Sequence, residues 1–446
     1  MHSYRAVLIA AHRLMQPELN QHHSATLGRS NTTTTRMFTR VVYSLCAACL
    51  VCGCDAPLAS FSSNLLVANR LERQTGLDLS EQTEAVDQLL EHLFGTPESP
   101  RWPKCLESDV RTKSLISLDY LAQAAGPVRS DQADQHFGLF REHCVFCHGL
   151  SGSGTGPTSS LLNPYPRDFR PGVFKFKTTG SGVKPTKADL RNTLVRGIPG
   201  TSMPTFSLLK SEELEILTDY VVYLAIRGEA ERRLLTELAL DMDLTDGQPF
   251  WKPDWESTRP ADYLAGLELA EQITQKIALA WAQPESQDNL VLSESDGIQL
   301  TNASRELDPG AVARGRALFN GKIAACSSCH GTEGKGDGAV RNFDFWTKDW
   351  TDGLDPDDRE AIRPLRKLGA LKTRPISPRN LQLGVFRGGS DPEDIYLRIV
   401  NGIDGTPMPA AALKPINPQG LSENDVQDLV SFVLSLSQNT SLGGNP

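Results

Sequence analysis

The apolar residues of this chain recur mainly with the period of an α-helix. Residues 81–94 and 113–124 each place apolar side chains on one helical face. Residues 229–283 have the same pattern almost throughout, with an interruption near 249–253, and the polar stretch 284–302 is typical of a linker. Little of the chain alternates apolar and polar residues as a strand does. The pattern therefore predicts an all-α protein.

Two long stretches of the chain repeat the same sequence blocks in the same order. Each begins with Cys-x-x-Cys-His-Gly, at 144–149 and at 326–331, followed by three glycines at the same offsets. Further along, residues 189–204 align without a gap to residues 394–409, and ten of these sixteen positions are identical or exchange Leu for Ile. Both stretches end in a helical pattern. Matched blocks in one order indicate a duplicated domain.

The repeated blocks and the segments between them predict five regions. These are a targeting segment at 1–53, a helical N-terminal region at 54–127, a first repeated domain at 128–228, a helical connector and linker at 229–302, and a second repeated domain at 303–440. The second domain carries an insertion at about 339–374, with two tryptophans and an acidic run from 349 to 360. We expect this run to be solvated, with a docking patch as the alternative.

The N-terminal segment has the features of an export signal. A basic stretch around Met37 precedes an apolar run from Val41 to Leu50, which is too short to remain as a membrane-spanning helix. Met37 is an alternative start of the chain. The next residues resemble a bacterial lipoprotein motif with Cys54 as the lipidated residue; an ordinary cysteine-rich signal peptide is the alternative. The sequence therefore predicts a periplasmic protein held at a membrane by a lipid anchor.

Composition and charge narrow the function classes. The 446 residues carry a formal net charge of −9, with 39% hydrophobic and 22% charged residues. These proportions suit a soluble globular protein with real cores, and the length is too great for one ordinary domain. The negative charge argues against a nucleic-acid partner, because phosphates require a basic surface.

The Cys-x-x-Cys-His motifs predict the chemistry of the repeated domains. The residues concerned are Cys144, Cys147 and His148 in the first copy, and Cys326, Cys329 and His330 in the second. Two thiols on one helical turn can add to both vinyl groups of a porphyrin, and the adjacent histidine can then bind its iron. A redox dithiol and a four-cysteine zinc site are the alternatives. The zinc site leaves both histidines unexplained, so the motifs favour two covalently bound haem c groups.

Two methionines recur at equivalent places and are candidates for the second axial ligand of each iron. Met203 and Met408 both lie in Gly-Thr-x-Met-Pro. The proline restricts the methionine backbone, which helps to present the sulfur. His136 is a weaker alternative ligand in the first copy, and we expect Met242, which has no counterpart, to fill a gap in a core.

These motifs resemble those of class I cytochrome c, and the duplicated chain is similar to a dihaem cytochrome c. The resemblance covers about residues 130–228 and 306–438. It implies a small all-α fold around each haem, in which an N-terminal helix crosses a C-terminal one. The crossing pairs would be 134–143 with 213–224, and 311–320 with 425–436. It implies two tandem domains of this kind but says nothing of the insertion at about 339–374 or of the regions outside the repeats. The helical pattern predicts the connector that joins the two domains and the extra helical region before them.

A haem whose two axial positions are filled exchanges electrons but does not readily bind a substrate. The sequence therefore predicts a dihaem electron-transfer protein whose partners are redox proteins. The alternatives are a dihaem enzyme such as a cytochrome c peroxidase or a dehydrogenase, a fixed cytochrome subunit of an oxidase or dehydrogenase complex, and a zinc-structured binding module. Arg167 and Arg379 recur in Pro-Arg and are either partners of the haem propionates or ordinary surface arginines.

Overall fold

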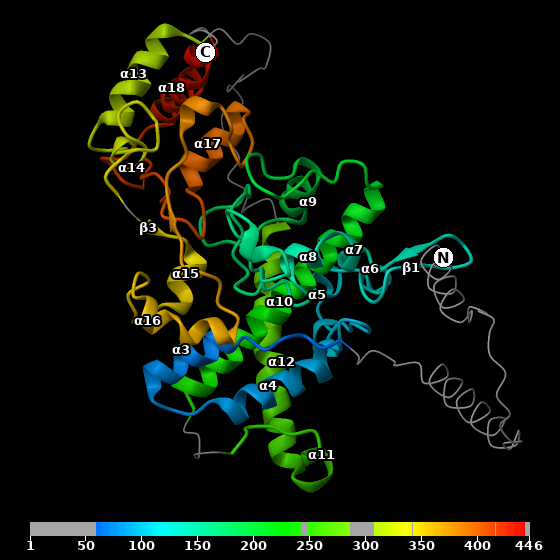
Figure 1. The fold of residues 1–446 in the computed structure, drawn as a ribbon. Coiled ribbons are helices and arrows are strands. Elements are labelled where there is room, and N and C mark those ends of the chain that lie inside the picture. The colour runs from blue at the N-terminus through cyan, green and yellow to red at the C-terminus, as the bar shows by residue number, and fades with distance from the viewer. Residues whose placement is uncertain (1–58, 243–247, 286–306, 341, 415, 442–446) are drawn as a thin grey trace, which may run out of the picture. The chain divides into compact units, whose positions relative to one another are not determined.

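The computed structural model describes residues 59–242, 248–285, 307–340, 342–414 and 416–441. The predicted export signal, with Met37 and Cys54, and most of the predicted linker lie outside these residues. Within the described ranges, no helix combines the length and the apolar character that a membrane span requires. The all-α class is confirmed, since the described strands form only two pairs of two residues each (Figure 1).

The N-terminal region is helical, as predicted, but one predicted helix is broken. Its helices are α3 (Leu65–Thr75), α4 (Ser80–Phe94), α5 (Val110–Lys113) and α6 (Leu118–Ala124). Helix α4 matches the predicted segment 81–94. The predicted segment 113–124 is interrupted before α6, where the Ser117 N–H donates to Oδ2 of Asp219 in a distant helix (2.8 Å). That N–H is therefore used in a tertiary hydrogen bond and does not extend the helical hydrogen bonding of α5.

One long helix organises the first half of the molecule. Helix α10 (Ser211–Leu240) contains the predicted segment 213–224 and continues without a break past residue 228, into the predicted connector. Its side chains are buried on nearly every face, and it packs against α3, α4, α6, α9 (Lys187–Arg196) and α12 (Pro260–Ala282). The N-terminal region, the first repeat and the connector therefore share a single hydrophobic core.

The first repeat begins with a hairpin where the sequence predicts a helix. Strands β1 (Arg129–Ser130) and β2 (His136–Phe137) pair antiparallel, with Arg129 opposite Phe137. Gly138 then adopts a left-handed conformation (φ 78°), so α7 (Leu139–His143) starts only after it. The predicted helix 134–143 is therefore correct only for its last five residues. The haem motif follows in α8 (Val145–His148).

The second repeat has a small core of its own. Helix α13 (Pro309–Asn320) crosses α18 (Glu423–Ser441), as the resemblance implied (Figure 1). The two backbones approach closely at Gly315, where a Cβ would collide with the backbone of Asp428. Helices α14 (Ser327–His330) and α17 (Pro392–Asn401) complete this unit. Its buried cluster contains only residues of the second repeat.

The insertion of the second repeat packs against the N-terminal region. Its elements are β3 (Asn342–Phe343), α15 (Phe345–Trp350), α16 (Arg359–Ile362), η5 (Pro364–Leu368) and β4 (Pro375–Ile376), with β3 and β4 paired antiparallel. Trp350 is 2% exposed and belongs to a third buried cluster that includes Leu66 of α3. Asp349 forms ion pairs with Arg70 and Arg232. The expectation of a solvated acidic run is therefore wrong at its first residue.

Several short elements complete the described structure: η1 (Lys104–Leu106), η2 (Ser159–Leu161), α11 (Trp255–Thr258), η3 (Gln283–Glu285) and η6 (Leu381–Leu383).

Candidate functional site

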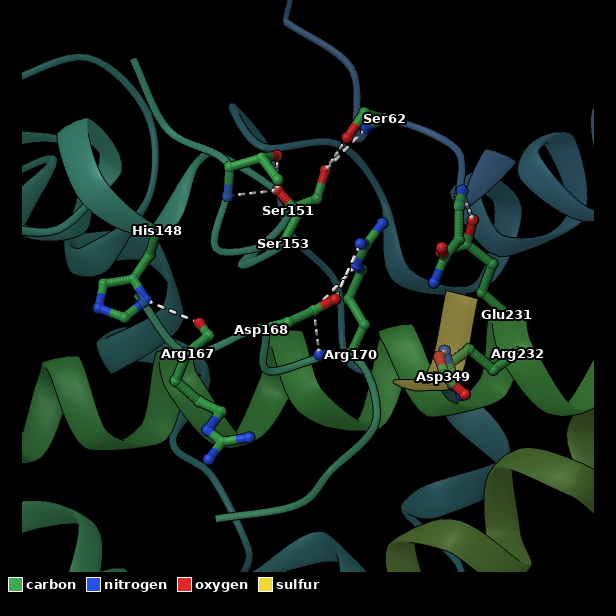
Figure 2. A network of polar contacts seen from close by, with 12 residues as sticks. Ser62, His148, Ser151, Ser153, Arg167, Asp168, Arg170, Glu231, Arg232 and Asp349 are labelled. Atoms are coloured by element: carbon green, nitrogen blue, oxygen red, sulfur yellow. Dashed lines mark hydrogen bonds and ion pairs between the residues drawn. The ribbon is translucent and has the colours of Figure 1, made fainter. Parts of the chain in front are cut away.

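In the first motif, one ring nitrogen of the histidine makes a hydrogen bond to the backbone, and the other is left available to bind a metal. Nδ1 of His148 lies 3.0 Å from the backbone oxygen of Arg167, the contact drawn in Figure 2. A carbonyl oxygen only accepts, so Nδ1 carries the proton and donates it. Nε2 therefore has its lone pair free to bind a metal. Burial lowers the pKa of His148 to about 4, which keeps the ring in the neutral form that a metal ligand requires.

The second motif repeats this arrangement. Nδ1 of His330 lies 3.3 Å from the backbone oxygen of Arg379, which stands at the position equivalent to Arg167. Burial lowers the pKa of His330 as well. The same backbone atom thus orients the imidazole in both repeats, although His148 is 8% exposed and His330 is only half-buried.

Glycine loops close over both motifs in the same way. The main-chain hydrogen bonds are Gly154 N to His148 O (2.9 Å), Gly156 N to Cys147 O (3.1 Å), Gly336 N to His330 O (2.8 Å) and Gly338 N to Cys329 O (3.1 Å). A Cβ at Gly156 or Gly338 would collide with carbonyl oxygens of the motif helix. Glycine is therefore required where the loop backbone lies on this helix.

The first cysteine of each motif lacks the lowered pKa of a redox dithiol, and the two pairs are not grouped as a zinc site requires. The described cysteines, Cys105, Cys144, Cys147, Cys326 and Cys329, are all free thiols. Burial raises the pKa of Cys144 to about 12 and that of Cys326 to about 11, whereas a redox dithiol has a lowered pKa. Across the described ranges, there is no group of three or more His, Cys, Asp or Glu side chains that could hold a metal ion. The two pairs therefore do not form a four-cysteine zinc site.

The two methionine loops have the same internal hydrogen bonds. In the first, Thr201 Oγ1 donates to Ile198 O (2.7 Å) and accepts from the N–H of Met203 (3.1 Å). The Ile198 N–H in turn donates to Met203 O (3.1 Å). In the second loop the equivalent distances are 2.7, 3.2 and 3.1 Å, between Thr406, Ile403 and Met408. The repeated threonine therefore shapes the turn that presents each methionine, a role that the sequence interpretation missed.

The surroundings of the two histidines differ in one aromatic residue. The ring of His148 stacks on Phe169, with centroids 4.5 Å apart and planes inclined by 22°. The equivalent position in the second repeat is Leu381, and the aromatic neighbour of His330 is Phe319 at 6.3 Å. The first imidazole is therefore held by an aromatic face that the second lacks.

Four basic residues from the two repeats lie near one another, half-buried. Arg167 and Lys175 come from the first repeat, and Arg379 and Arg387 stand at the equivalent positions of the second. Burial, together with Arg167, lowers the pKa of Lys175 to about 7, and burial and Arg379 lower the pKa of Arg387. Arg167 and Arg379 are therefore not ordinary surface arginines. The sequence interpretation missed Lys175 and Arg387, although their recurrence after Gly-Val-Phe was a signal.

Three shielded N–H groups of these cations have no hydrogen-bond partner in the part of the chain that the structure describes. They are Arg167 Nη2, Arg379 Nε and Arg387 Nε. Paired thiols beside an imidazole with a free Nε2, together with nearby N–H donors in need of acceptors, fit a haem c with its carboxylate groups. Coordination of the iron by Met203 and Met408 stays a prediction.

Three other sequence predictions have distinct outcomes. His136 Nε2 lies 2.6 Å from a carboxylate oxygen of Glu142, and its role as an alternative ligand stays a prediction. Met242 is 41% exposed, so the expectation that it fills a core is wrong; it lies just beyond the end of α10. Cys54, the predicted lipidation site, lies outside the described residues.

Comparison with known proteins supports the resemblance found in the sequence. Residues 137–225 and 312–437 match the family model of cytochrome c. Among solved structures, the chain is similar to a chain of the reducing HAO-like protein complex of Kuenenia stuttgartiensis. The identity is 22%, the match covers 70% of this chain and 98% of that chain, and the TM-score is 0.39. No curated protein matches the chain.

Proposed function

We propose that the two cytochrome c domains of this chain bind one haem c each and that the protein transfers electrons between redox partners outside the cytoplasmic membrane. The attachment residues are Cys144 and Cys147 for the first haem, and Cys326 and Cys329 for the second. The axial ligands are His148 with Met203, and His330 with Met408. The haem supplies an iron that exchanges one electron with little rearrangement when both axial positions are filled.

The main observation behind this proposal is that both histidines make the same hydrogen bond to the backbone. Each ring donates Nδ1–H to a backbone oxygen of the following Pro-Arg segment, at 3.0 Å for His148 and 3.3 Å for His330. This hydrogen bond fixes the tautomer and orientation of a metal-binding imidazole and raises its basicity. Because both copies keep it, both are built for the same iron chemistry.

A dihaem enzyme would need one iron with an open or releasable position. The two methionine loops instead have the same three hydrogen bonds, at distances within 0.1 Å of each other. Electron transfer by two closed haems is therefore the function that the geometry supports best. A free carrier and a fixed cytochrome subunit share this chemistry and differ only in how tightly they hold a partner.

The visible spectrum of the purified protein tests the proposal. We expect two haem c per chain, a weak far-red band from methionine–iron bonding in the oxidised protein, and no change on adding carbon monoxide to the reduced protein. Met203→Ala and Met408→Ala should each open one haem to carbon monoxide. A carbon monoxide response in the unaltered protein would instead favour the enzyme, and a colourless protein would exclude both.

We also propose that the chain is exported and anchored by a lipid on Cys54. The sequence around Cys54 supports this, since small residues and a cysteine follow a short apolar run. Cys54→Ser should move the haem protein from the membrane fraction to the soluble periplasmic fraction, while Cys105→Ser should leave it in place. A native protein that is already soluble in the periplasm contradicts the anchor.

A further inference from the structure

Among the described residues, few carboxylates lie near the four half-buried cations Arg167, Lys175, Arg379 and Arg387. The carboxylates that interact with them are Asp344 and Asp168. Asp168 already accepts two side-chain hydrogen bonds from Arg170, at 3.0 and 2.9 Å, as Figure 2 shows. Asp344 caps α15 by accepting from the Thr347 N–H (2.7 Å). The group of cations, which we call the basic cluster, therefore keeps excess positive charge in a half-buried place.

In two arginines of the basic cluster, Arg379 and Arg167, the backbone oxygen and the guanidinium contact different repeats. The backbone oxygen of Arg379 holds His330 of its own repeat, whereas its guanidinium faces the methionine loop of the first repeat. A Cβ on Gly200 of that loop would lie 3.0 Å from Nη2 of Arg379 and 3.2 Å from Cγ1 of Val385. Gly200 precedes Met203 by three residues. Arg379 therefore reaches the first haem site from the second repeat.

The reverse contact is also present. The backbone oxygen of Arg167 holds His148, and its guanidinium faces the methionine loop of the second repeat. A Cβ on Gly405 would lie 3.1 Å from Nη1 of Arg167 and 3.3 Å from Cγ1 of Val173. The two repeats thus exchange equivalent side chains, and glycine at both positions leaves room for the guanidinium.

Other contacts fix the two repeats around this exchange. Lys177 forms an ion pair with Asp404 (2.9 Å), and the guanidinium of Arg398 donates to the backbone oxygens of Lys175 (3.2 Å) and Lys177 (2.7 Å). Arg196 pairs with Asp394 (3.1 Å) at a more exposed place. These contacts use Lys177, Arg196 and both terminal nitrogens of Arg398, although Nε of Arg398 has no partner among the described residues. The basic cluster differs in having three such N–H groups, on three arginines, and no side-chain ion pair among the described residues.

We propose that the basic cluster is one shared site for the propionate groups of both haems, so that an arginine of each repeat binds the haem of the other repeat. This inference rests on the proposed function, because it requires a haem in each domain. Guanidinium groups bind carboxylates through paired charge-assisted hydrogen bonds, which would satisfy the unpartnered nitrogens. Sharing one set of cations brings the carboxylate edges of the two haems to the same interface and makes the charge state of each haem felt by the other.

The reduction potentials of the two haems test the shared site. A nearby cation favours the reduced haem, which carries one more negative charge, so removing it lowers the potential. Arg379→Gln should lower the potential of the first haem as well as the second, each by roughly a tenfold change in the reduction equilibrium, or about 59 mV for one electron. Arg167→Gln should do the same. Met203→His and Met408→His, which lower the potential of one haem each, identify the two titration waves.

Matched variants separate this outcome from loss of structure. Arg316→Gln removes the same charge from the second repeat at an exposed place and should shift both potentials much less. Arg379→Lys keeps the charge, so both potentials should stay close to their native values, even where the glutamine variant folds poorly. A shift confined to the haem of the altered repeat, or equal to that of Arg316→Gln, would overturn the shared site. A native protein without two haems would instead overturn the proposed function itself.

Discussion

The two repeats have the same geometry around their Cys-x-x-Cys-His motifs but are stabilised in different ways. The first repeat shares its core with the N-terminal region and the connector, through α10. The second has a separate core around the crossing of α13 and α18. Around the histidines, however, the hydrogen bonds of one repeat are those of the other. The two repeats therefore share the geometry at their motifs and differ in the packing that supports it.

This difference teaches which contacts the haem chemistry requires. The features common to both repeats lie at the motif and at the methionine turn: the His–carbonyl hydrogen bond, the glycine loop and the threonine of the turn. The features that differ, such as the length of α10 or the insertion, lie farther from the motifs. Contacts common to both repeats should therefore control the haems, and contacts found in one repeat should control stability.

Truncating one core leucine in each repeat tests the difference in support and should have the largest effect. Leu217 of α10 is 0% exposed and Leu429 of α18 is 1% exposed. Each change to alanine should cost about 2–5 kcal/mol through lost burial and a cavity. Leu217→Ala should loosen the N-terminal region and the connector together with the first repeat, whereas Leu429→Ala should loosen the second repeat alone. Hydrogen exchange mapped along the chain distinguishes these outcomes. If both variants lowered the protection of the same regions, the two repeats would not have separate cores.

The next largest effect concerns the contact between the insertion and the N-terminal region. Asp349 pairs with Arg70 and Arg232, and its side chain is 15% exposed. Asp349→Asn should cost about 3 kcal/mol, because it leaves two largely buried arginines without their anion. We expect faster proteolysis of α15 and α3, with little change in haem spectra. Asp352→Asn, at an exposed residue of the same segment, is the matched control.

The same contact should weaken in acid. Burial opposes ionisation of Asp349, but Arg232 and Arg70 more than compensate and lower its pKa. A carboxyl whose folded pKa lies below its unfolded value stabilises the fold fully above the unfolded value, about 3.9 for Asp, and loses this contribution as the pH falls through the folded pKa. A protection of α15 that does not change between neutral pH and pH about 3 would contradict this assignment.

The sequence could predict the features that recur in both repeats, but not those that depend on packing. Duplication revealed the Cys-x-x-Cys-His motifs and both methionine loops, because equivalent residues stand at equivalent places. It could not reveal that the predicted helix 134–143 begins with a hairpin, since that depends on a left-handed Gly138. Nor could it show Asp349 buried beside Arg70, because their contact joins segments 279 residues apart.

A smaller effect should follow from removing the threonine of either methionine turn. Thr201→Val and Thr406→Val each delete one donated and one accepted hydrogen bond, which should cost about 1–2 kcal/mol in the closed form of the loop. Carbon monoxide binding to the reduced protein should then increase by about tenfold at the altered site. Thr205→Val is the control, because its hydroxyl bonds the Val195 and Ser207 backbone and not that of Met203. An effect in one repeat only would mean that the two turns are not equivalent.

The smallest effect should come from the one aromatic residue that distinguishes the two histidines. Phe169 stacks on His148 at 4.5 Å, whereas the second repeat has Leu381 in its place. Phe169→Leu should cost about 1 kcal/mol, the value of a stacked ring pair beyond its burial. Because the His148 hydrogen bond to the backbone remains, the potential of the first haem should hardly change. Phe174→Leu, which removes a ring stacked on Phe169 but not on His148, is the control. If Phe169→Leu alone shifts the potential strongly, the aromatic face, and not the carbonyl shared by both repeats, orients this imidazole.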